Sequence, residues 1–329
     1  MESPVTYTEL LARLASVQGV DEFSVVFDSP YLLVDIEGWQ SREGKAQSSE
    51  RLSQPNCPVI ALADADSALP PEIDLVAHTE MELTLLTESI QHHSVAVAML
   101  VSLLRHNEHA SLEDGLFAES LSYSCLQNGE SFLNWLAQNQ LRKVAEEDFS
   151  SLVIMDRHQD KLTITLNRPY KRNAYSADLR DALYEALTLA ALDESITKVI
   201  VQGAGENFSA GGDLTEFGEA RDGAFAHVAR MTRNSALLLN QLKAKTEFHL
   251  HGACIGAGIE LPSFSDCVIA APGTFFQLPE IAMGLIPGAG GTVSILNRIG
   301  RIRTAYMAVS NERIDTETAL KWGLIDEIS

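Results

Sequence analysis

The sequence is poor in cysteine and in basic residues. Its four cysteines form no CxxC pair and no regular framework. This excludes a disulfide-stapled scaffold, so we expect reduced thiols and a cytoplasmic protein. Lys and Arg together number 24 against 45 Asp and Glu, a net charge of −21. So acidic a chain is poorly suited to nucleic acid or to an anionic membrane surface, and we expect neither as a partner.

Long apolar runs are also absent. The longest, Val95 to Val101, is too short to cross a bilayer and predicts a buried helix instead. The first residues, MESPVTYTELL, are acidic rather than basic, so we expect neither a signal nor a transit peptide. Apolar residues make up 46% of the 329, which allows a substantial core, and the length favours about two domains.

The acidic residues are concentrated in the first half of the chain. Residues 1–150 hold 7 basic and 24 acidic side chains, a net of −17, whereas residues 151–329 hold 17 and 21, a net of −4. We therefore predict an acidic N-terminal α/β domain, residues 1–148, and a second domain, residues 149–329. The first domain contains no catalytic motif that would assign it a role.

The first domain is expected to begin with short elements and to end in helices. Apolar spacing predicts a helix over 6–18 ended by Gly19, and a helical region over 80–144 broken at Gly115 and Gly129. His106 and His109 lie three apart in this region without a further ligand at zinc spacing, so we assign no metal. The remaining predicted elements are strands at 23–27, 31–36, 59–63 and 73–77 and an exposed loop at 38–56.

The second domain opens with the pattern of a β-hairpin. Residues 152–155 and 162–166 are apolar strands around a polar turn. Ser176 is a suitable cap for a helix predicted over 177–192, and a further strand follows at 199–202. Two glycines come after that strand, but Phe208 replaces the third glycine of a dinucleotide fingerprint, so that interpretation fails.

Two carboxylates and several small-residue turns indicate the chemistry. Glu260 follows Gly256-Ala257-Gly258, and Glu280 precedes a glycine cluster at 288–291. Backbone N–H groups in such turns can hold an anion, and carboxylates among apolar neighbours have raised pKa values that suit proton transfer near neutral pH. This combination favours a reaction that forms an oxyanion and moves protons.

These segments resemble the enoyl-CoA hydratase/isomerase (crotonase) superfamily. One glycine-rich string is weak evidence, but five pieces in the family's order and near its spacing are specific. The resemblance covers about residues 151–329 and implies an α/β fold with a crotonase-like ββα spiral. The matching pieces are Asn167-Arg168-Pro169 with Asn173-Ala174, FSAGGDL at 208–214, GACIGAGIEL at 252–261, FFQLPEIAMGLIPGAGGT at 275–292 and AL-x-WGL-x-D at 319–326.

The resemblance also implies a substrate and an assembly. The substrate would be an acyl-CoA, with coenzyme A as part of the substrate and no separate cofactor. The protein would be a homo-oligomer, a trimer or hexamer. Typical relatives continue with several helices beyond the point that corresponds to Ser329, and the added N-terminal domain is a candidate to replace them.

Individual residues take roles from the resemblance. Glu260 and Glu280, twenty positions apart, would hold and polarise one water, with Glu280 protonating C2 and Glu260 activating the water. Ala210 and Ala257 would supply the N–H groups of the oxyanion hole. The other substrate-binding positions are Arg168, Lys171, Arg172, Gly211, Asp213, Gly256 and Gly288, although a solvated basic turn explains Lys171 and Arg172 equally well.

Three functions stay open at this point. The pair of glutamates favours hydration of a 2-enoyl-CoA to a 3-hydroxyacyl-CoA. An enoyl-CoA isomerase or thioester hydrolase on the same fold is the second hypothesis. The third hypothesis is a non-catalytic subunit that binds CoA esters or assists assembly. It stays open because Pro262 can kink the helix that carries Glu260, because the usual C-terminal helices are missing and because a domain is added.

Overall fold

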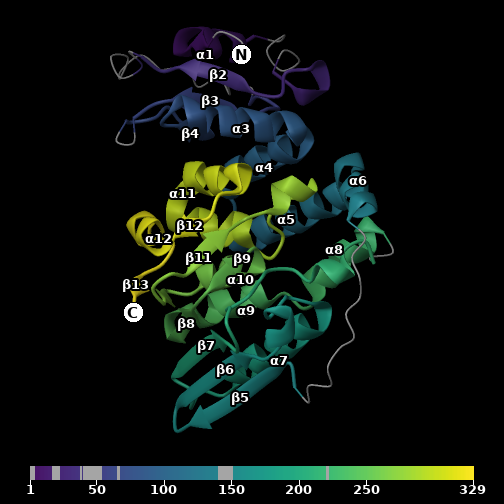
Figure 1. The fold of residues 1–329 in the computed structure, drawn as a ribbon, viewed down its shortest axis with the longest axis vertical. Coiled ribbons are helices and arrows are strands. Elements are labelled where there is room, and N and C mark those ends of the chain that lie inside the picture. Colours follow the sequence, from purple (N-terminus) through teal and green to yellow (C-terminus); the bar gives the residue numbers. More distant parts are fainter. Residues whose placement is uncertain are drawn as a thin grey trace.

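The strands of the two halves of the chain lie in separate sheets. The computed structural model describes residues 4–16, 23–37, 39, 54–64, 67–139, 151–219 and 222–329. Within these ranges the N-terminal half forms a four-stranded sheet, and the C-terminal half forms a six-stranded and a three-stranded sheet (Figure 1).

The N-terminal sheet is parallel, with the order β1-β2-β3-β4. It confirms the strands predicted at 31–36, 59–63 and 73–77, with the last one shorter. The strand predicted at 23–27 is wrong, because Ser24 caps a single 3₁₀ turn that ends at Asp28 in a left-handed conformation. The bounds are β1 (Val5–Thr6), β2 (Leu32–Asp35), β3 (Val59–Leu62) and β4 (Leu75–Ala77).

Five helices accompany this sheet in the described part of the N-terminal half. The first is α1 (Tyr7–Leu14), which begins in a capping box between Thr6 and Glu9. The helix predicted over 6–18 is shorter than expected, because it ends at Leu14, well before Gly19. Gly19 itself and most of the loop predicted at 38–56 lie outside the described residues. The other four are α3 (Glu80–His92), α4 (Ser94–Asn107), α5 (Leu112–Gln127) and α6 (Glu130–Gln138). None of the helices in the described ranges is both long and apolar enough to cross a membrane.

The region predicted to be helical is mostly helical up to residue 138, but its breaks are corrected, because α3 and α4 are separated at His93 and α4 and α5 at residues 108–111. Gly129 does separate two helices, α5 and α6. Gly115 is not a break but lies inside α5. A Cβ at Gly115 would approach Val293 Cγ2 to 2.9 Å, so glycine allows another helix to pack closely here.

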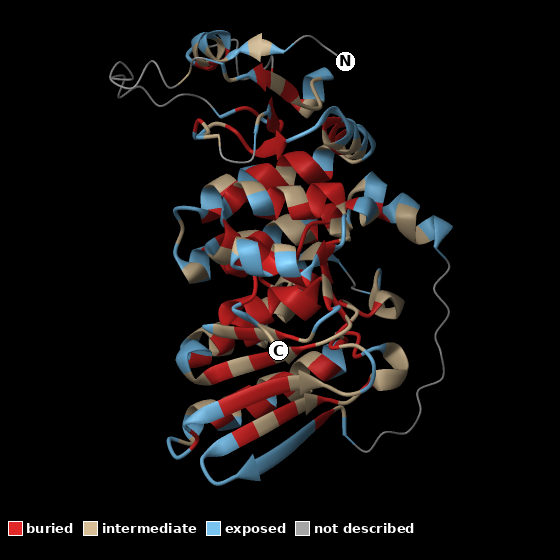
Figure 2. Cartoon of the chain, turned by 60° about the vertical axis from the view of Figure 1, so that its left-hand side comes forward, coloured by how far each residue is buried: buried red, intermediate tan, exposed pale blue. Residues whose placement is uncertain are grey.

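The six-stranded sheet has the order β13-β10-β8-β7-β6-β5 and is parallel except for the β5–β6 hairpin. The hairpin, the next strand and the helix capped by Ser176 are as predicted. Its outer strand β5 is exposed after Val153 (Figure 2). The bounds are β5 (Val153–His158), β6 (Lys161–Leu166), β7 (Lys198–Gly203), β8 (Thr246–Leu250), β10 (Cys267–Ala270) and β13 (Glu327–Ile328).

The three-stranded sheet lies between the six-stranded sheet and the helices (Figure 1). Its strands are β9 (Ala253–Ile255), β11 (Phe275–Gln277) and β12 (Ile314–Asp315). The helices of this half are α7 (Ala177–Leu192), α8 (Gly223–Thr232), α9 (Ser235–Leu242), α10 (Ala257–Glu260), α11 (Gly291–Ser310) and α12 (Thr316–Trp322).

Helix α11 joins the two halves of the chain. It packs against α3, α4, α5 and β4, and most of its residues are buried. The apolar side chains of α3, α4 and α5 therefore belong to the same hydrophobic cluster as those of the C-terminal sheets. Figure 2 shows this buried layer in the middle of the molecule. The N-terminal helices thus share the core of the C-terminal half.

A buried carboxylate reinforces this junction. Asp74 is fully buried and accepts hydrogen bonds from the Val59 N–H at 2.9 Å and from the guanidinium groups of Arg105 on α4 and Arg301 on α11. A second acid, Glu108, accepts from Arg301 Nε at 3.1 Å. Paired charges of this kind are stable only while all partners are present.

We expect Asp74→Asn to lower the free energy of unfolding by about 3 kcal/mol, because it leaves two largely buried guanidinium groups without their shared carboxylate. Urea denaturation would measure the loss. The control is Asp64→Asn at an exposed position. A decrease below about 1 kcal/mol, the range of surface substitutions, would contradict this role.

Candidate active site

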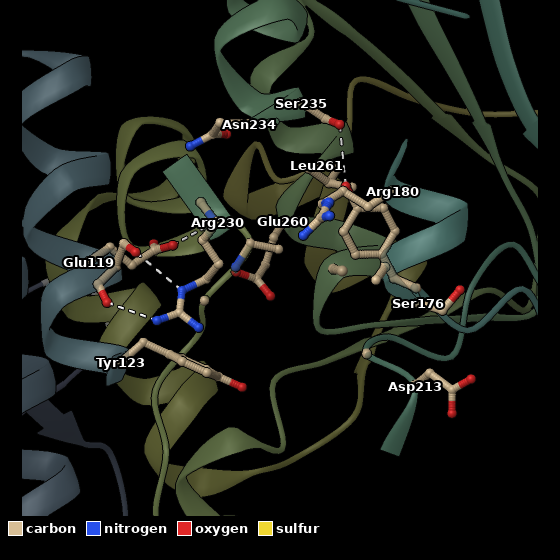
Figure 3. A pocket seen from close by; sticks show the side chains of 18 of the residues that line it. Glu119, Tyr123, Ser176, Arg180, Asp213, Arg230, Asn234, Ser235, Glu260 and Leu261 are labelled. Carbon is tan, nitrogen blue, oxygen red and sulfur yellow. Dashed lines mark hydrogen bonds between the residues drawn. The ribbon is translucent and has the colours of Figure 1, made fainter. Parts of the chain in front are cut away.

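A cavity of about 250 Å³ lies where α5 meets the loops of the C-terminal sheets (Figure 3). Both halves of the chain contribute to its wall. The N-terminal half supplies Glu119 and Tyr123 from α5, and the C-terminal half supplies Glu260, Glu280 and Gly288. The two glutamates singled out in the sequence therefore line one cavity.

Glu260 is held rigidly by the glycine cluster. It ends the one-turn helix α10, and its side chain is buried, at 2% exposure. Its Oε2 accepts from the N–H groups of Ala289 at 2.8 Å and Gly291 at 2.9 Å. A Cβ at Gly291 would come within 2.8 Å of that oxygen, so only glycine leaves room for the carboxylate. After Glu260 the chain turns into a 3₁₀ segment at Pro262, and the predicted interruption of the helix is confirmed.

Glu280 lies beside Glu260 across Gly256. A Cβ at Gly256 would lie 2.5 Å from Glu280 Oε1 and 3.8 Å from Glu260 Oε1, and Gly256 has a φ of 49°, so both space and backbone require glycine. Glu280 Oε2 is buried and has no hydrogen-bond partner among the described residues. Burial raises the pKa of Glu280 to about 7, and burial together with the charge of Glu280 raises the pKa of Glu260 well above its usual range.

A third buried glutamate was not predicted from the sequence. Glu119 on α5 is 2% exposed, and its carboxylate accepts from Gly290 N–H at 2.7 Å and from Thr292 N–H at 3.0 Å and Oγ1–H at 2.6 Å. Burial raises the pKa of Glu119 to about 7 in spite of these hydrogen bonds. The sequence signal is weak, since a lone Glu on a helix usually faces solvent. Its spacing from Leu116 and Tyr123, three before and four after, places it on the inward face.

The glycine cluster also allows α5 to approach. A Cβ at Gly288 would lie 2.4 Å from the ring of Tyr123, and one at Gly290 would lie 2.6 Å from the ring of Phe264 and 3.3 Å from Leu116 Cδ2. No side chain fits at either position without moving an aromatic ring. The glycines at 288 and 290 are thus explained by packing, and those at 256 and 291 by the carboxylates.

The turn at residues 208–214 corrects one predicted site residue. Ala210 does not supply a free N–H, because its N–H donates to the carbonyl of Arg172 at 2.9 Å. The N–H of Gly211 is also engaged, with Ser209 Oγ at 3.2 Å. Gly212 lines the cavity, and its N–H has no acceptor among the described residues. Gly212 therefore replaces Ala210 as the N–H donor that this turn can offer.

Ala257 also lines the cavity and begins α10. Its N–H likewise has no acceptor in the described part of the chain, as expected for the first turn of a helix. Gly211, with a φ of 86°, would place a Cβ 2.8 Å from the carbonyl oxygen of Ile255, so glycine brings this turn against the strand that precedes Ala257. The two available N–H groups belong to Gly212 and Ala257.

The predicted phosphate-binding residues differ in their surroundings. Arg168 is 2% exposed, and its guanidinium pairs with Asp213 at 2.6 Å, which leaves it inside the protein rather than facing a ligand. Lys171 pairs with the same carboxylate at 3.2 Å. Against the effect of burial, hydrogen bonds from Thr215, Arg168 and Lys171 lower the pKa of Asp213 to about 2. Asp213 and Arg168 thus fix the turn, while Arg172 is exposed.

Within the described ranges no three His, Cys, Asp or Glu side chains lie close enough together to bind one metal ion. The cavity is lined by the three buried carboxylates and by the backbone of Gly212 and Ala257.

This site and this fold define a class of enzymes that process acyl-CoA esters. Residues 157–329 match the family model described as enoyl-CoA hydratase/isomerase, and the chain belongs to this family. The 2,3-dehydroadipyl-CoA hydratase of Escherichia coli (strain K12) is 35% identical over 181 residues, which are 54% of this chain and 69% of that protein.

Solved structures agree with this assignment. The enoyl-CoA hydratase of Thermoplasma volcanium GSS1 superposes with a TM-score of 0.50 at 31% identity, over 54% of this chain and 71% of that one. DspI of Pseudomonas aeruginosa does so with a TM-score of 0.51 at 30% identity, over 57% and 71%. The predicted crotonase fold is confirmed. Residues 1–156, which include Glu119 and Tyr123, lie outside the stretch that the family model matches.

We expect Glu119→Gln to lower the free energy of unfolding by about 1–3 kcal/mol. Glutamine offers one acceptor oxygen in place of two, so Gly290 or Thr292 would face an amide donor. Urea denaturation would measure the loss, with Glu113→Gln, exposed on the same helix, as the matched control. Equal stability of the two variants would contradict a role for Glu119 in holding the glycine cluster.

Glu280 predicts a pH-dependent stability. Its pKa is raised above the unfolded value of 4.5, so its contribution is complete below pH 4.5 and is lost as the pH rises through about 7. Glu280→Gln removes this loss. Between pH 4.5 and pH 8 we expect the free energy of unfolding of the variant to rise by about 1–3 kcal/mol relative to that of the wild type. The reason is that the variant no longer buries an ionised carboxylate with an unpartnered oxygen. Parallel stability profiles of the two proteins over this range would refute it.

Proposed function

We propose that the protein adds water across the C2–C3 double bond of a 2-enoyl-CoA and releases the 3-hydroxyacyl-CoA. The observation that carries this proposal is the pair of buried carboxylates on either side of Gly256. One is fixed by two N–H donors, and the other has an oxygen without a protein partner. A water between them would meet one oxygen of each.

The backbone supports the charge that develops during this reaction. When the oxygen of water bonds to C3, electrons move to the thioester oxygen and an enolate forms. The N–H groups of Gly212 and Ala257 are the donors we assign to this oxyanion, because both line the cavity and neither is used within the described residues. Fixed donors of this kind favour the transition state over the ground state, since the charge appears only as the bond forms.

The hydrogen bonds divide the acid and base roles. Burial raises the pKa of Glu260, but its two N–H donors hold the carboxylate in place and favour its charged form against that effect, so we assign it as the base that takes a proton from water. One oxygen of Glu280 has no hydrogen-bond partner among the described residues, and burial raises its pKa to about 7, so a large fraction of this carboxyl holds a proton at neutral pH. It gives that proton to C2 as the enolate collapses. The reaction then balances, with one proton taken by Glu260 and one supplied by Glu280, and requires no cofactor beyond coenzyme A in the substrate.

The surroundings of the cavity complete the proposal. Lys171 and Arg172 remain the candidates for the phosphates of coenzyme A, whereas the buried Arg168 serves to position the turn. A homo-oligomer, the trimer or hexamer implied by the resemblance, also remains a proposal. The relatives include isomerases as well as hydratases, and the presence of both glutamates favours hydration.

We expect purified wild type to remove the absorbance of the conjugated double bond of a short-chain 2-enoyl-CoA. Glu260→Gln and Glu280→Gln should each reduce turnover by about 100-fold or more, the usual contribution of one acid or base, because glutamine keeps the shape but transfers no proton. Binding of the CoA ester should change little. Glu317→Gln, exposed on α12, is the matched control.

Mass analysis of the products separates the other hypotheses, because a shift of the double bond also removes the conjugated absorbance but leaves the mass unchanged, whereas hydration adds one water. Release of free coenzyme A and the free acid would mean a thioester hydrolase. If wild type shifts the double bond without adding water, the protein is an isomerase. If it binds CoA esters and turns over none of them, it is a binding subunit that retains the site without the chemistry.

A further inference from the structure

One end of the cavity carries a positive charge. In Figure 3, Asp213 and Ser176 lie on one side of Glu260, and Tyr123 and Arg230 lie on the other. Arg230 comes from α8, and Tyr123 comes from α5. A thioester held at Gly212 and Ala257, with C2 and C3 beside Glu260, would direct the rest of its acyl chain toward this second side.

The hydrogen-bond partners of Arg230 are all neutral. Its Nε donates to Ser120 Oγ at 3.2 Å, one terminal nitrogen donates to Gln127 Oε1 at 3.1 Å, and the other donates to the carbonyl of Ser120 at 3.1 Å and to Ser124 Oγ. These four bonds leave one of the five guanidinium N–H donors unused. The guanidinium carbon also lies over the Tyr123 ring, 4.8 Å from the centre of the ring. The same ring packs on Gly288.

No carboxylate forms an ion pair with Arg230 in the described part of the chain. The other arginines of the cavity wall do have acidic partners: Arg180 pairs with Asp181 at 2.8 Å, and Arg233 pairs with Glu185 at 3.1 Å. Glu119 is the nearby negative charge, but both of its oxygens are used by Gly290 and Thr292. Arg230 is therefore a partly buried cation on a ligand cavity, without an ion pair to a carboxylate in the described part of the chain.

A plain hydrocarbon chain fits this end poorly. It would remove water from the guanidinium and offer no acceptor in return, which is costly for a charged group. An anionic oxygen would instead receive a charge-assisted hydrogen bond, the strong kind in such surroundings. A tether between α5 and α8 explains the four hydrogen bonds of Arg230, but it does not require a cation there.

We propose that this end of the cavity binds a carboxylate at the far end of the acyl chain, so that the preferred substrate is the CoA ester of a dicarboxylic acyl group rather than of a plain fatty acid. The assignment rests on the proposed function for the position of the thioester. The carboxylate accepts from the unused N–H of Arg230, with the hydroxyl of Tyr123 close by.

Saturated CoA esters test this preference apart from catalysis, since they contain no double bond to hydrate. We expect calorimetry to show adipyl-CoA binding wild type about tenfold or more tightly than hexanoyl-CoA, which has the same number of carbons. Arg230→Gln should lose this ratio without weakening the binding of hexanoyl-CoA, because the cost of removing water from the guanidinium disappears with the charge, and Arg230→Lys should restore part of the ratio. Arg303→Gln, on α11 where the guanidinium stacks over Trp322 outside the cavity, should leave the ratio as in wild type.

Three results would overturn the proposal. Equal affinity of wild type for the two esters would exclude recognition of the carboxylate. An equal loss of both affinities in Arg230→Gln would assign Arg230 to the tether alone. A third ester, 6-hydroxyhexanoyl-CoA, separates charge from polarity, because binding as tight as that of adipyl-CoA would mean that a neutral oxygen suffices. Failure of wild type to hydrate 2-enoyl-CoA esters, with the adipyl preference intact, would refute the proposed reaction and leave this binding site standing.

Discussion

The division of four consecutive N–H groups between two carboxylates is the interaction on which the site depends. Ala289 and Gly291 donate to Glu260, while Gly290 and Thr292 donate to Glu119. Alternate N–H groups point to opposite sides of the loop, so each carboxylate fixes the segment for the other. They stand at the start of α11, where the helix dipole favours negative charge. Helix α5 is thereby part of the active-site wall and not an appendage to it.

Local patterns predicted most of the fold. The stripe Leu83, Leu86 and Ile90 is buried as its helical spacing indicated, and Ser176 begins its helix where expected. The prediction failed where a local hydrogen bond to the backbone decides the conformation against the preference of apolar residues for a strand. Residues 25–27 have the composition of a strand, yet the cap at Ser24 and the left-handed Asp28 fold them into a single turn. Gly115 misled because of a long-range contact. It is required by close packing against Val293, which lies on α11, 178 positions later in the chain.

The candidate site was predictable as far as its motifs reach. Glu260, Glu280 and Ala257 lie together on the cavity as expected. Ala210 could not be excluded from the sequence, because the carbonyl that occupies its N–H belongs to Arg172 in another loop. The role of Glu119 could not be predicted for a similar reason, since its spacing indicates only an inward-facing side chain and its partners are 171 and 173 residues away. Motifs identify residues that are close in the sequence, whereas the partner of each hydrogen bond depends on the tertiary structure.

The shared core has a consequence for how the protein is made. The hydroxyl of Ser89 on α3 bonds to the carbonyl of Val309, 220 residues later, and Asn107 on α4 bonds to Thr292, 185 residues later. A ribosome adds about 5–20 residues per second, so the apolar faces of α3, α4 and α5 remain uncovered for roughly ten seconds or more before α11 is synthesised. Contacts of such sequence separation also form slowly. The nascent N-terminal half is therefore a natural client for a chaperone that shields apolar helices until synthesis is complete.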